Sequence, residues 1–227
     1  MNKFKELSNP LQNIDNDIYK KLVSYPLTFN EIIDCVLRTQ NELNDAFNEE
    51  KNPYAWAHPI NDSTEWGCLY EREFRRKANK LGIIEFIAGD HNTGEDLTCV
   101  SNPEYSIEFK TSQGTSFWNT NSRSRKCEST KYIDPNKKTF YILVKHSINE
   151  YGEMSANTKV SKIYFGMLSK NDWTNSTGAG AAYLHANVRN LQFIEIWNDI
   201  VGNTIDHYQS LLDNDYYDKM IEIEKII

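Results

Sequence analysis

Gly94-Glu95-Asp96-Leu97-Thr98-Cys99-Val100 and, four residues later, Tyr105-Ser106-Ile107-Glu108-Phe109-Lys110-Thr111-Ser112 decide the fold of this chain. Both runs have the composition of short β-strands, and the Ser101-Asn102-Pro103 sequence between them favours a turn. Residues two apart in a strand share a face. Glu108 and Lys110 are therefore predicted to point one way, while Ile107 and Phe109 point the other way into a core.

Pairing of the two runs would bring Asp96 onto one patch with Glu108 and Lys110. Two carboxylates and an ammonium form a site for a hard divalent cation and a phosphate. The backbone carbonyl of Phe109 lies between the charged residues and is a further candidate metal ligand. The alternative is a solvated strand face on which these charges form a cross-strand pair.

An Asp, a spacer and then Glu-x-Lys on an antiparallel strand pair resembles the PD-(D/E)xK nuclease superfamily. The resemblance implies that Asp96 is the first metal-binding acid, Glu108 the second, and Lys110 the lysine beside the attacking water. One position departs from the pattern, because Glu95 precedes the first acid where the superfamily motif has Pro.

A helix before the core often adds another acid in this superfamily, and the candidates here are Glu71 and Glu73. The apolar face of that helix centres near Phe74 and Ala78. At about 100° per residue, Glu71 lies nearer to this face than Glu73, so we expect Glu71 to complete the catalytic set with Asp96, Glu108 and Lys110. The alternative is that both glutamates are solvent-facing helix charges.

Hydrolysis of a phosphodiester needs an activated water and stabilisation of charge on the phosphate and on the leaving oxygen, and a divalent metal supplies all three. We expect Mg²⁺, with Mn²⁺ as a substitute and Ca²⁺ supporting DNA binding without cleavage. Lys110 would lower the pKa of a metal-bound water or hold the phosphate. A lysine near a strand end is expected to be exposed, so Lys110→Ala should change stability by about 0.5 kcal/mol or less.

A long polar stretch follows the Glu-x-Lys-Thr-Ser run. Its Asn and Gln side chains suit adenine edges, its Arg side chains suit guanine, and Ser and Thr bind phosphates. The polar stretch is followed by Tyr141-Ile142-Leu143-Val144, Phe165-Gly166-Met167-Leu168, Asp172-Trp173 and Thr177-Gly178. This order resembles the ScaI-like family of Type II restriction endonucleases.

Thirteen residues are predicted to contact DNA: Thr111, Ser112, Gln113, Ser116, Trp118, Asn119, Asn121, Arg123, Arg125, Lys126, Lys131, Trp173 and Thr177. Two alternatives remain at this stage. Trp173 would also fit in a core, and the segment 112–131 would also fit a disordered loop.

The net charge of −7 over 227 residues argues against a passive polyanion binder but not against a nuclease, because the local distribution of charge decides. Basic residues cluster at 72–80 and 123–138, and acids gather near 41–50 and 213–224. The four dispersed cysteines indicate a reducing, cytoplasmic setting of the prokaryotic type rather than structural zinc or disulfides. No apolar run approaches the length of a membrane span.

The predicted fold is α/β, with a mixed central β-sheet flanked by helices, as the resemblance also implies. Residues 1–227 are predicted to form one endonuclease domain, with a catalytic core at about 65–197 and helical additions at both ends. Periodicity predicts helices at 11–24, 29–49, 65–80 and 203–226, and strands at 83–88, 96–100, 105–111, 139–147, 160–168 and 191–197. The first three strands are expected to be antiparallel.

Four finer predictions concern the ends of these elements. Asn30 is predicted to cap the second helix, and Ser63 or Thr64 the third. Gly82 is predicted to end the third helix. The segment 112–137 is predicted to be a polar loop, and a helix rich in small residues is predicted to start after Gly180.

The function that these features predict is Mg²⁺-dependent cleavage of double-stranded DNA by a homodimer at a palindromic, AT-rich site. The alternatives are a structure-specific or repair nuclease with the same core, such as a junction resolvase, and a non-catalytic DNA-binding protein. Fixed bands from linear DNA would indicate restriction, whereas structure-dependent cutting would indicate a resolvase.

Overall fold

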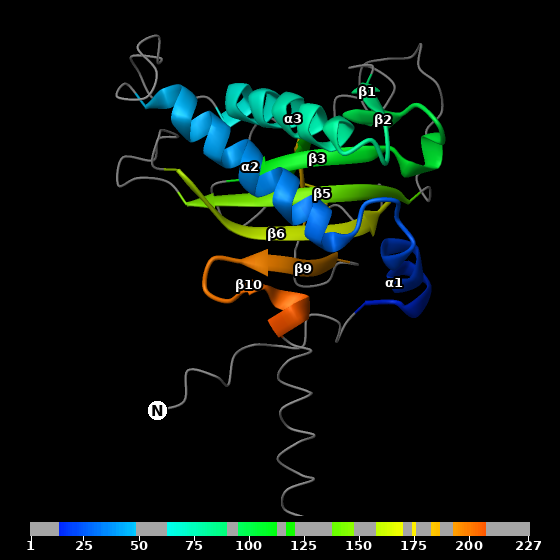
Figure 1. Cartoon of the computed structure of the whole chain (residues 1–227). Coiled ribbons are helices and arrows are strands. Elements are labelled where there is room, and N and C mark those ends of the chain that lie inside the picture. Colours follow the sequence, from blue (N-terminus) through cyan, green and yellow to red (C-terminus); the bar gives the residue numbers. More distant parts are fainter. Residues whose placement is uncertain are drawn as a thin grey trace, which may run out of the picture.

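The computed structural model describes residues 14–48, 63–89, 95–112, 117–120, 138–147, 158–169, 174–175, 183–186 and 193–207. Helices α2 (Phe29–Phe47) and α3 (Ser63–Lys80) lie across one face of a seven-stranded sheet, and the short helix α1 (Asn16–Val23) packs beside it (Figure 1). No helix in these ranges has both the length and the apolar character to cross a membrane.

The main sheet has the strand order β1-β2-β3-β5-β6-β9-β10. Its strands are β1 (Phe86–Ala88), β2 (Leu97–Cys99), β3 (Ile107–Ser112), β5 (Thr139–Ser147), β6 (Lys159–Leu168), β9 (Phe193–Asn198) and β10 (Gly202–Asn203). The pair β3–β5 is parallel and the other neighbours are antiparallel. The sheet is therefore mixed, and the predicted α/β class is confirmed, as is the antiparallel arrangement of the first three strands.

Helix α2 begins with a capping box, in which the Thr28 hydroxyl accepts from the Glu31 N–H and the Glu31 carboxylate accepts from the Thr28 N–H. The prediction that Asn30 caps this helix is therefore wrong, because Asn30 already lies inside its first turn. Helix α3 ends as predicted at Gly82, whose φ of 71° suits a residue without a Cβ. Ser63 and Thr64 both fall within α3 as the structure assigns it.

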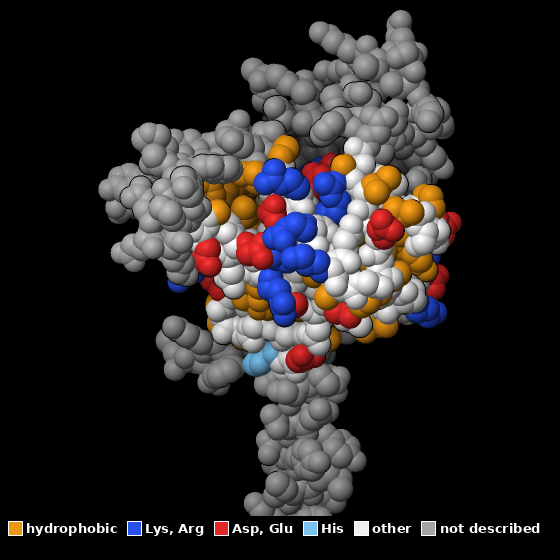
Figure 2. Space-filling model, turned by 45° about the horizontal axis from the view of Figure 1, so that its top comes forward, with side chains coloured by type: hydrophobic (Ala, Val, Ile, Leu, Met, Phe, Trp, Pro, Cys, Tyr) orange, Lys and Arg blue, Asp and Glu red, His pale blue; other side chains and the backbone are white. Residues whose placement is uncertain are grey.

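Lys and Arg side chains form a band over the face that carries α2 and α3, with acidic side chains beside them (Figure 2). Several of these basic residues are in ion pairs with acids of the same two helices: Arg38 with Asp34, Arg76 with Glu73 and Glu42, Lys77 with Glu42, and Arg72 with Glu73. Much of the positive charge that the sequence concentrates at 72–80 is therefore neutralised within the helix layer.

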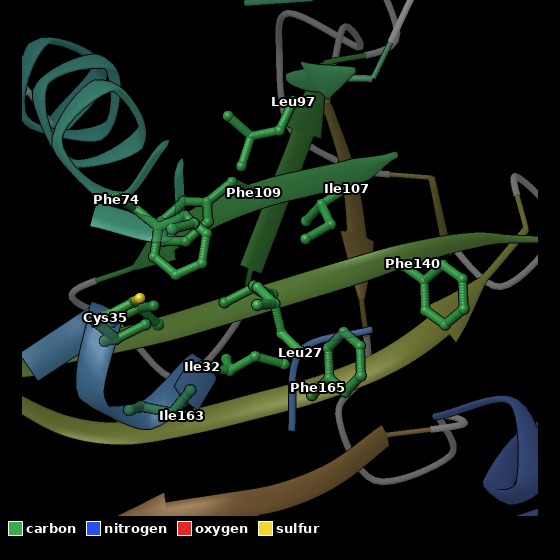
Figure 3. Packing of buried hydrophobic residues seen from close by; sticks show 14 of the residues in the cluster. Leu27, Ile32, Cys35, Phe74, Leu97, Ile107, Phe109, Phe140, Ile163 and Phe165 are labelled. Carbon is green, nitrogen blue, oxygen red and sulfur yellow. The ribbon is translucent and has the colours of Figure 1, made fainter. Parts of the chain in front are cut away.

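The core lies between the helices and the sheet, where alternate residues of the strands meet α2 and α3 (Figure 3). The strands contribute Ile107 and Phe109 from β3, Phe140, Ile142 and Val144 from β5, Ile163 and Phe165 from β6, and Ile194 and Ile196 from β9. Burying each such side chain contributes about 1.5–3 kcal/mol. This packing fixes which face of every strand is turned away from the helices.

Four short strands, β4 (Phe117–Thr120), β7 (Thr174–Asn175), β8 (Tyr183–Ala186) and β10, lie in segments for which the sequence predicts no strand. β4 falls within the predicted polar loop, and it pairs with β8, which in turn pairs with β7. The prediction of a continuous loop at 112–137 is wrong at β4, and that of a helix after Gly180 is wrong at β8. These strands are short, and partners distant in the chain satisfy their backbone groups.

The remaining predicted elements agree in kind, with shifted ends. β1 begins at Phe86 rather than Ile83, since residues 81–85 form a turn and an irregular segment. The last predicted helix is described only at 204–207, and its continuation to 226 lies outside the described residues. A 3-10 helix (Pro103–Tyr105) occupies the turn between β2 and β3.

Candidate active site

The Asp96 carboxylate lies beside β3, just beyond the end of the β2–β3 pairing. The two strands pair at Leu97 and Ile107. The Phe109 N–H donates to Asp96 Oδ2 over 2.9 Å, and the Asp96 N–H donates to Glu108 Oε2 over 3.3 Å. The backbone of β3 thus orients the acid on β2, and the two carboxylates face the same space.

Lys110 bridges the two acids. Its Nζ lies 2.7 Å from Asp96 Oδ2 and 2.8 Å from Glu108 Oε1. Burial alone would lower the pKa of Lys110, but the charges of Glu108 and Asp96 raise it above its usual range, so the ammonium form is held. Only 19% of the side chain is exposed, so the expectation of an exposed lysine at this position is wrong.

Gly89, at the end of β1, holds the backbone that carries Asp96. Its N–H donates to the Asp96 carbonyl over 2.9 Å. A Cβ at this position would overlap with the carbonyl oxygen of Glu95. The sequence places Gly89 in a turn, but it does not reveal this close approach, which depends on a contact across the β1–β2 pair.

Glu71 of α3 interacts with the same charges. Burial, with a smaller contribution from the charge of Asp96, raises the pKa of its carboxyl from 4.5 to about 7, while Lys110 and Arg75 act in the opposite direction. Glu73 instead forms ion pairs with Arg72 and Arg76. The structure therefore brings Glu71, rather than Glu73, to the cluster of Asp96, Glu108 and Lys110.

Helix α3 is held close to β3 by small and aromatic residues. A Cβ on Gly67 would lie 3.3 Å from Thr111 Oγ1, so this threonine faces the helix. Tyr70 stacks on Phe109 with ring centroids 5.8 Å apart. This packing fixes the height of Glu71 above the strand.

A buried histidine on β5 completes the support beneath α3. The Trp66 indole N–H donates to His146 Nε2 over 3.4 Å, and the Tyr70 ring contacts the imidazole edge-on at 5.0 Å. Burial lowers the pKa of His146 from 6.5 to about 3, which favours the neutral imidazole.

The structure separates the other predicted DNA contacts into three groups. Thr111 faces α3, and Ser112 is buried on the same face of β3 as Lys110. Trp118 and Asn119 lie on β4 and pair with His185 and Leu184 of β8, and their side chains are not described. The remaining nine lie outside the described residues: Gln113, Ser116, Asn121, Arg123, Arg125, Lys126, Lys131, Trp173 and Thr177.

The donors at Asp96 and Glu108 fit a magnesium ion rather than a closed metal cage. Within the described ranges, no three His, Cys, Asp or Glu side chains form a group that could hold a metal. Mg²⁺ is commonly bound through one or two carboxylates, with waters and substrate phosphate as its other ligands. Two carboxylates that converge on one ammonium match that requirement for hard oxygen donors.

Comparison with known proteins supplies the class. A profile of restriction endonucleases matches residues 10–197, most of the chain, so the protein is a Type II restriction endonuclease, a site-specific deoxyribonuclease. The profile is that of the ScaI restriction endonuclease, and the chain belongs to this family.

Two other comparisons accompany this match. Among solved structures, the restriction endonuclease BglI bound to its DNA recognition sequence is similar, with a TM-score of 0.39 and 12% identity over 74% of this chain and 88% of that chain. No curated protein sequence matches the chain significantly.

Proposed function

We propose that this restriction endonuclease cuts DNA at the cluster of Asp96, Glu108, Lys110 and Glu71. The observation that carries the proposal is the position of Lys110 Nζ, at 2.7 and 2.8 Å from two carboxylates on neighbouring strands. A surface ion pair needs one acid, whereas a phosphodiester site needs acids and a cation on the same side of the reacting phosphate.

Mg²⁺ is the proposed cofactor, and Asp96, Glu108 and the carbonyl of Phe109 are its proposed ligands. When bound, the ion would supply an acidified water and charge stabilisation on the phosphate. The chain's own contribution is positional, because the Phe109 N–H and Lys110 Nζ fix Asp96. We expect Mn²⁺ to substitute and Ca²⁺ to support binding alone.

Lys110 is proposed to exchange its contacts with the two carboxylates for a contact with the scissile phosphate or the attacking water. The raised pKa of Lys110 keeps its ammonium group protonated for that role. Glu71, with a pKa near neutrality, is suited to take or give a proton close to Lys110. The electrostatic influence of Asp96 and Lys110 on Glu71 supports this pairing of roles.

Recognition is proposed to involve the polar stretch after β3, whose amide and guanidinium groups suit base edges. Asn and Gln favour adenine, so an AT-rich site is proposed. A homodimer on a palindrome would give each strand one copy of the site, since a two-fold protein matches a two-fold sequence. Residues 1–227 are proposed to act as one domain.

Cleavage assays test the catalytic assignment. Asp96→Asn and Glu108→Gln should each abolish Mg²⁺-dependent cutting of plasmid DNA, because each removes an anionic oxygen donor. Gel-shift binding in Ca²⁺ should stay equal or strengthen, since negative charge near the phosphate is reduced. Glu104→Gln, at an exposed acid before β3, is the matched control and should cut normally.

Loss of DNA binding together with cutting in Asp96→Asn, at an unchanged melting temperature, would contradict the assignment of Asp96 as a metal ligand. Normal cutting by either variant would remove that residue from the active site.

A further inference from the structure

The face of the sheet turned away from the helices carries charged residues beside buried apolar ones such as Leu143 and Tyr164. On β3 this second face bears Glu108, Lys110 and Ser112, because Ile107 and Phe109 point into the core (Figure 3). On β5 and β6 it bears Lys145 and Lys162, which alternate with core residues in the same way.

The strand register places these lysines in one row. Ser112, two residues beyond Lys110, pairs with Lys145, and Lys145 pairs with Lys162. β3, β5 and β6 lie side by side in that order (Figure 1). With strands about 4.8 Å apart and two residues spanning about 6.6 Å, the backbones of Lys145 and Lys162 lie about 8 and 12 Å from that of Lys110.

One glutamate of β9 holds this pair of lysines together. Lys162 Nζ lies 2.7 Å from Glu195 Oε2, and Asn198 Nδ2 donates to Glu195 Oε1 over 2.8 Å. Burial lowers the pKa of Lys145, and repulsion from Lys162 lowers it further, while Glu195 raises it. Two cations therefore share the influence of one carboxylate.

The lysine row remains accessible to a ligand. Lys162 exposes 43% of its side chain, compared with 19% for Lys110. A like-charge pair on one side of a sheet costs free energy unless a counter-charge is added. Glu195 supplies one counter-charge to this pair, and a bound anion would add a second.

The basic band on the helix face is a weaker candidate for the same ligand. Arg38, Arg76 and Lys77 pair with acids of α2 and α3, just as Lys162 pairs with Glu195, so pairing alone does not separate the two candidates. That band, however, lies over the helix layer, whereas Glu108 and Lys110 are on the second face.

We propose that Lys145 and Lys162 form a phosphate-binding subsite that holds the DNA backbone beside the phosphodiester at Lys110. This inference rests on the proposed function in one respect, namely that the reacting phosphate lies at Lys110. A DNA strand carries one phosphate for about every 3.4 Å of helix axis. Phosphates flanking the one at Lys110 therefore come within reach of the long lysine side chains.

The salt dependence of binding tests the subsite without requiring cleavage. Lys145→Gln, Lys162→Gln and the double variant would be titrated with a labelled mixed-sequence DNA duplex in Ca²⁺ over a series of KCl concentrations. Each lost phosphate contact should reduce the slope of log K against log salt by about 0.9. The ratio of wild-type to variant affinity should thus fall roughly threefold as the salt concentration rises from about 50 to about 200 mM.

Two controls separate this role from a structural one. Lys20→Gln removes an exposed lysine of α1 that is also paired with an acid, Asp17, and it should leave the slope unchanged. Lys162→Arg keeps the charge and should keep the slope. Glu195→Gln removes the competing carboxylate and should preserve or strengthen binding.

The subsite is overturned if folded Lys145→Gln and Lys162→Gln proteins both keep the wild-type slope. It is also overturned if Glu195→Gln weakens DNA binding as much as Lys162→Gln, because Lys162 would then serve only its ion pair. Cleavage that depends on Asp96 and Glu108 with unchanged slopes would leave the proposed function intact. Changed slopes together with cleavage that does not depend on these acids would support the subsite and contradict the proposed function.

Discussion

At the scale of single residues, the candidate site depends on Gly89, which has no reactive side chain. Gly89 donates to the Asp96 carbonyl and passes so close to Glu95 that a side chain would overlap with its backbone. Asp96 is thus located by backbone contacts on one side and by β3 on the other. An acid held this way keeps its position whether or not a cation is bound.

Gly89→Ala should therefore lower kcat by roughly 10²-fold, the scale expected when a reacting group is displaced by about 1 Å. Gly82→Ala provides the control, because the φ of Gly82 is 71° but the space around it is open. That change should cost about 1–2 kcal/mol of stability and leave kcat unaltered. Single-turnover cleavage and thermal melts would measure both, and equal kcat values for the two variants would contradict the positioning role of Gly89.

At the scale of elements, helix α2 is fixed at its first turn by the reciprocal bonds of Thr28 and Glu31. The helix contributes Ile32, Cys35 and Val36 to the core against the sheet. Its start therefore sets which of its residues reach the strands.

Thr28→Ala should lower the free energy of unfolding by about 1 kcal/mol, since the Glu31 N–H loses its acceptor. Asn30→Ala, inside the first turn, should change it less. Urea denaturation would measure the difference, and a larger loss for Asn30→Ala would indicate that the cap bond contributes little.

Sequence reasoning succeeded where one period dominates a segment. Ile107 and Phe109 alternate with Glu108 and Lys110, so the face of each residue on β3 could be predicted, and the helical angle favoured Glu71 over Glu73. The cap of α2 was predicted wrongly at Asn30, although Thr28 and Glu31 have the spacing of a capping box. The strand β4 could not be predicted, because its partner β8 lies more than sixty residues away and the local sequence pattern carries no information about distant pairing.

At the scale of the whole molecule, the half-buried Glu71 and the buried His146 give the stability opposite dependences on pH. The pKa of Glu71 is raised to about 7, so the folded state holds a proton that the unfolded state releases above about 4.5. The stability contributed by the protonated Glu71 carboxyl is fully present below pH 4.5 and is lost as the pH rises to 7. The pKa of His146 is lowered to about 3, so its contribution is full above 6.5 and is lost as pH falls towards 3.

Melting temperatures recorded in EDTA from pH 4 to 8 would separate the two groups. Glu71→Gln should reduce the fall in melting temperature between pH 4.5 and pH 7. His146→Phe should reduce the fall in melting temperature as the pH drops below 6.5. An unchanged profile for Glu71→Gln would show that its carboxyl is not held protonated by burial and Asp96.

The register of the whole sheet could not be predicted, because it arises from packing between distant segments. Nothing local to β3 or β5 specifies that they run parallel, or that Ser112 stands level with Lys145. The lysine row on the second face was missed for the same reason, although Lys145 directly follows one apolar run and Lys162 directly precedes another.

The parallel pairing of β3 and β5 has a consequence for how such an enzyme diversifies. The chain leaves β3 at Ser112 and must re-enter the sheet at Thr139, level with the opposite end of β3. A crossing of that length, about 20 Å, takes only about six extended residues, yet residues 113–138 supply many more. Of the described residues in this stretch, β4 (Phe117–Thr120) pairs with β8 rather than with the seven-stranded sheet. If residues 113–138 read the DNA bases, as proposed, substitutions there would change the target sequence while the β3–β5 pair beside Lys110 stays unaltered.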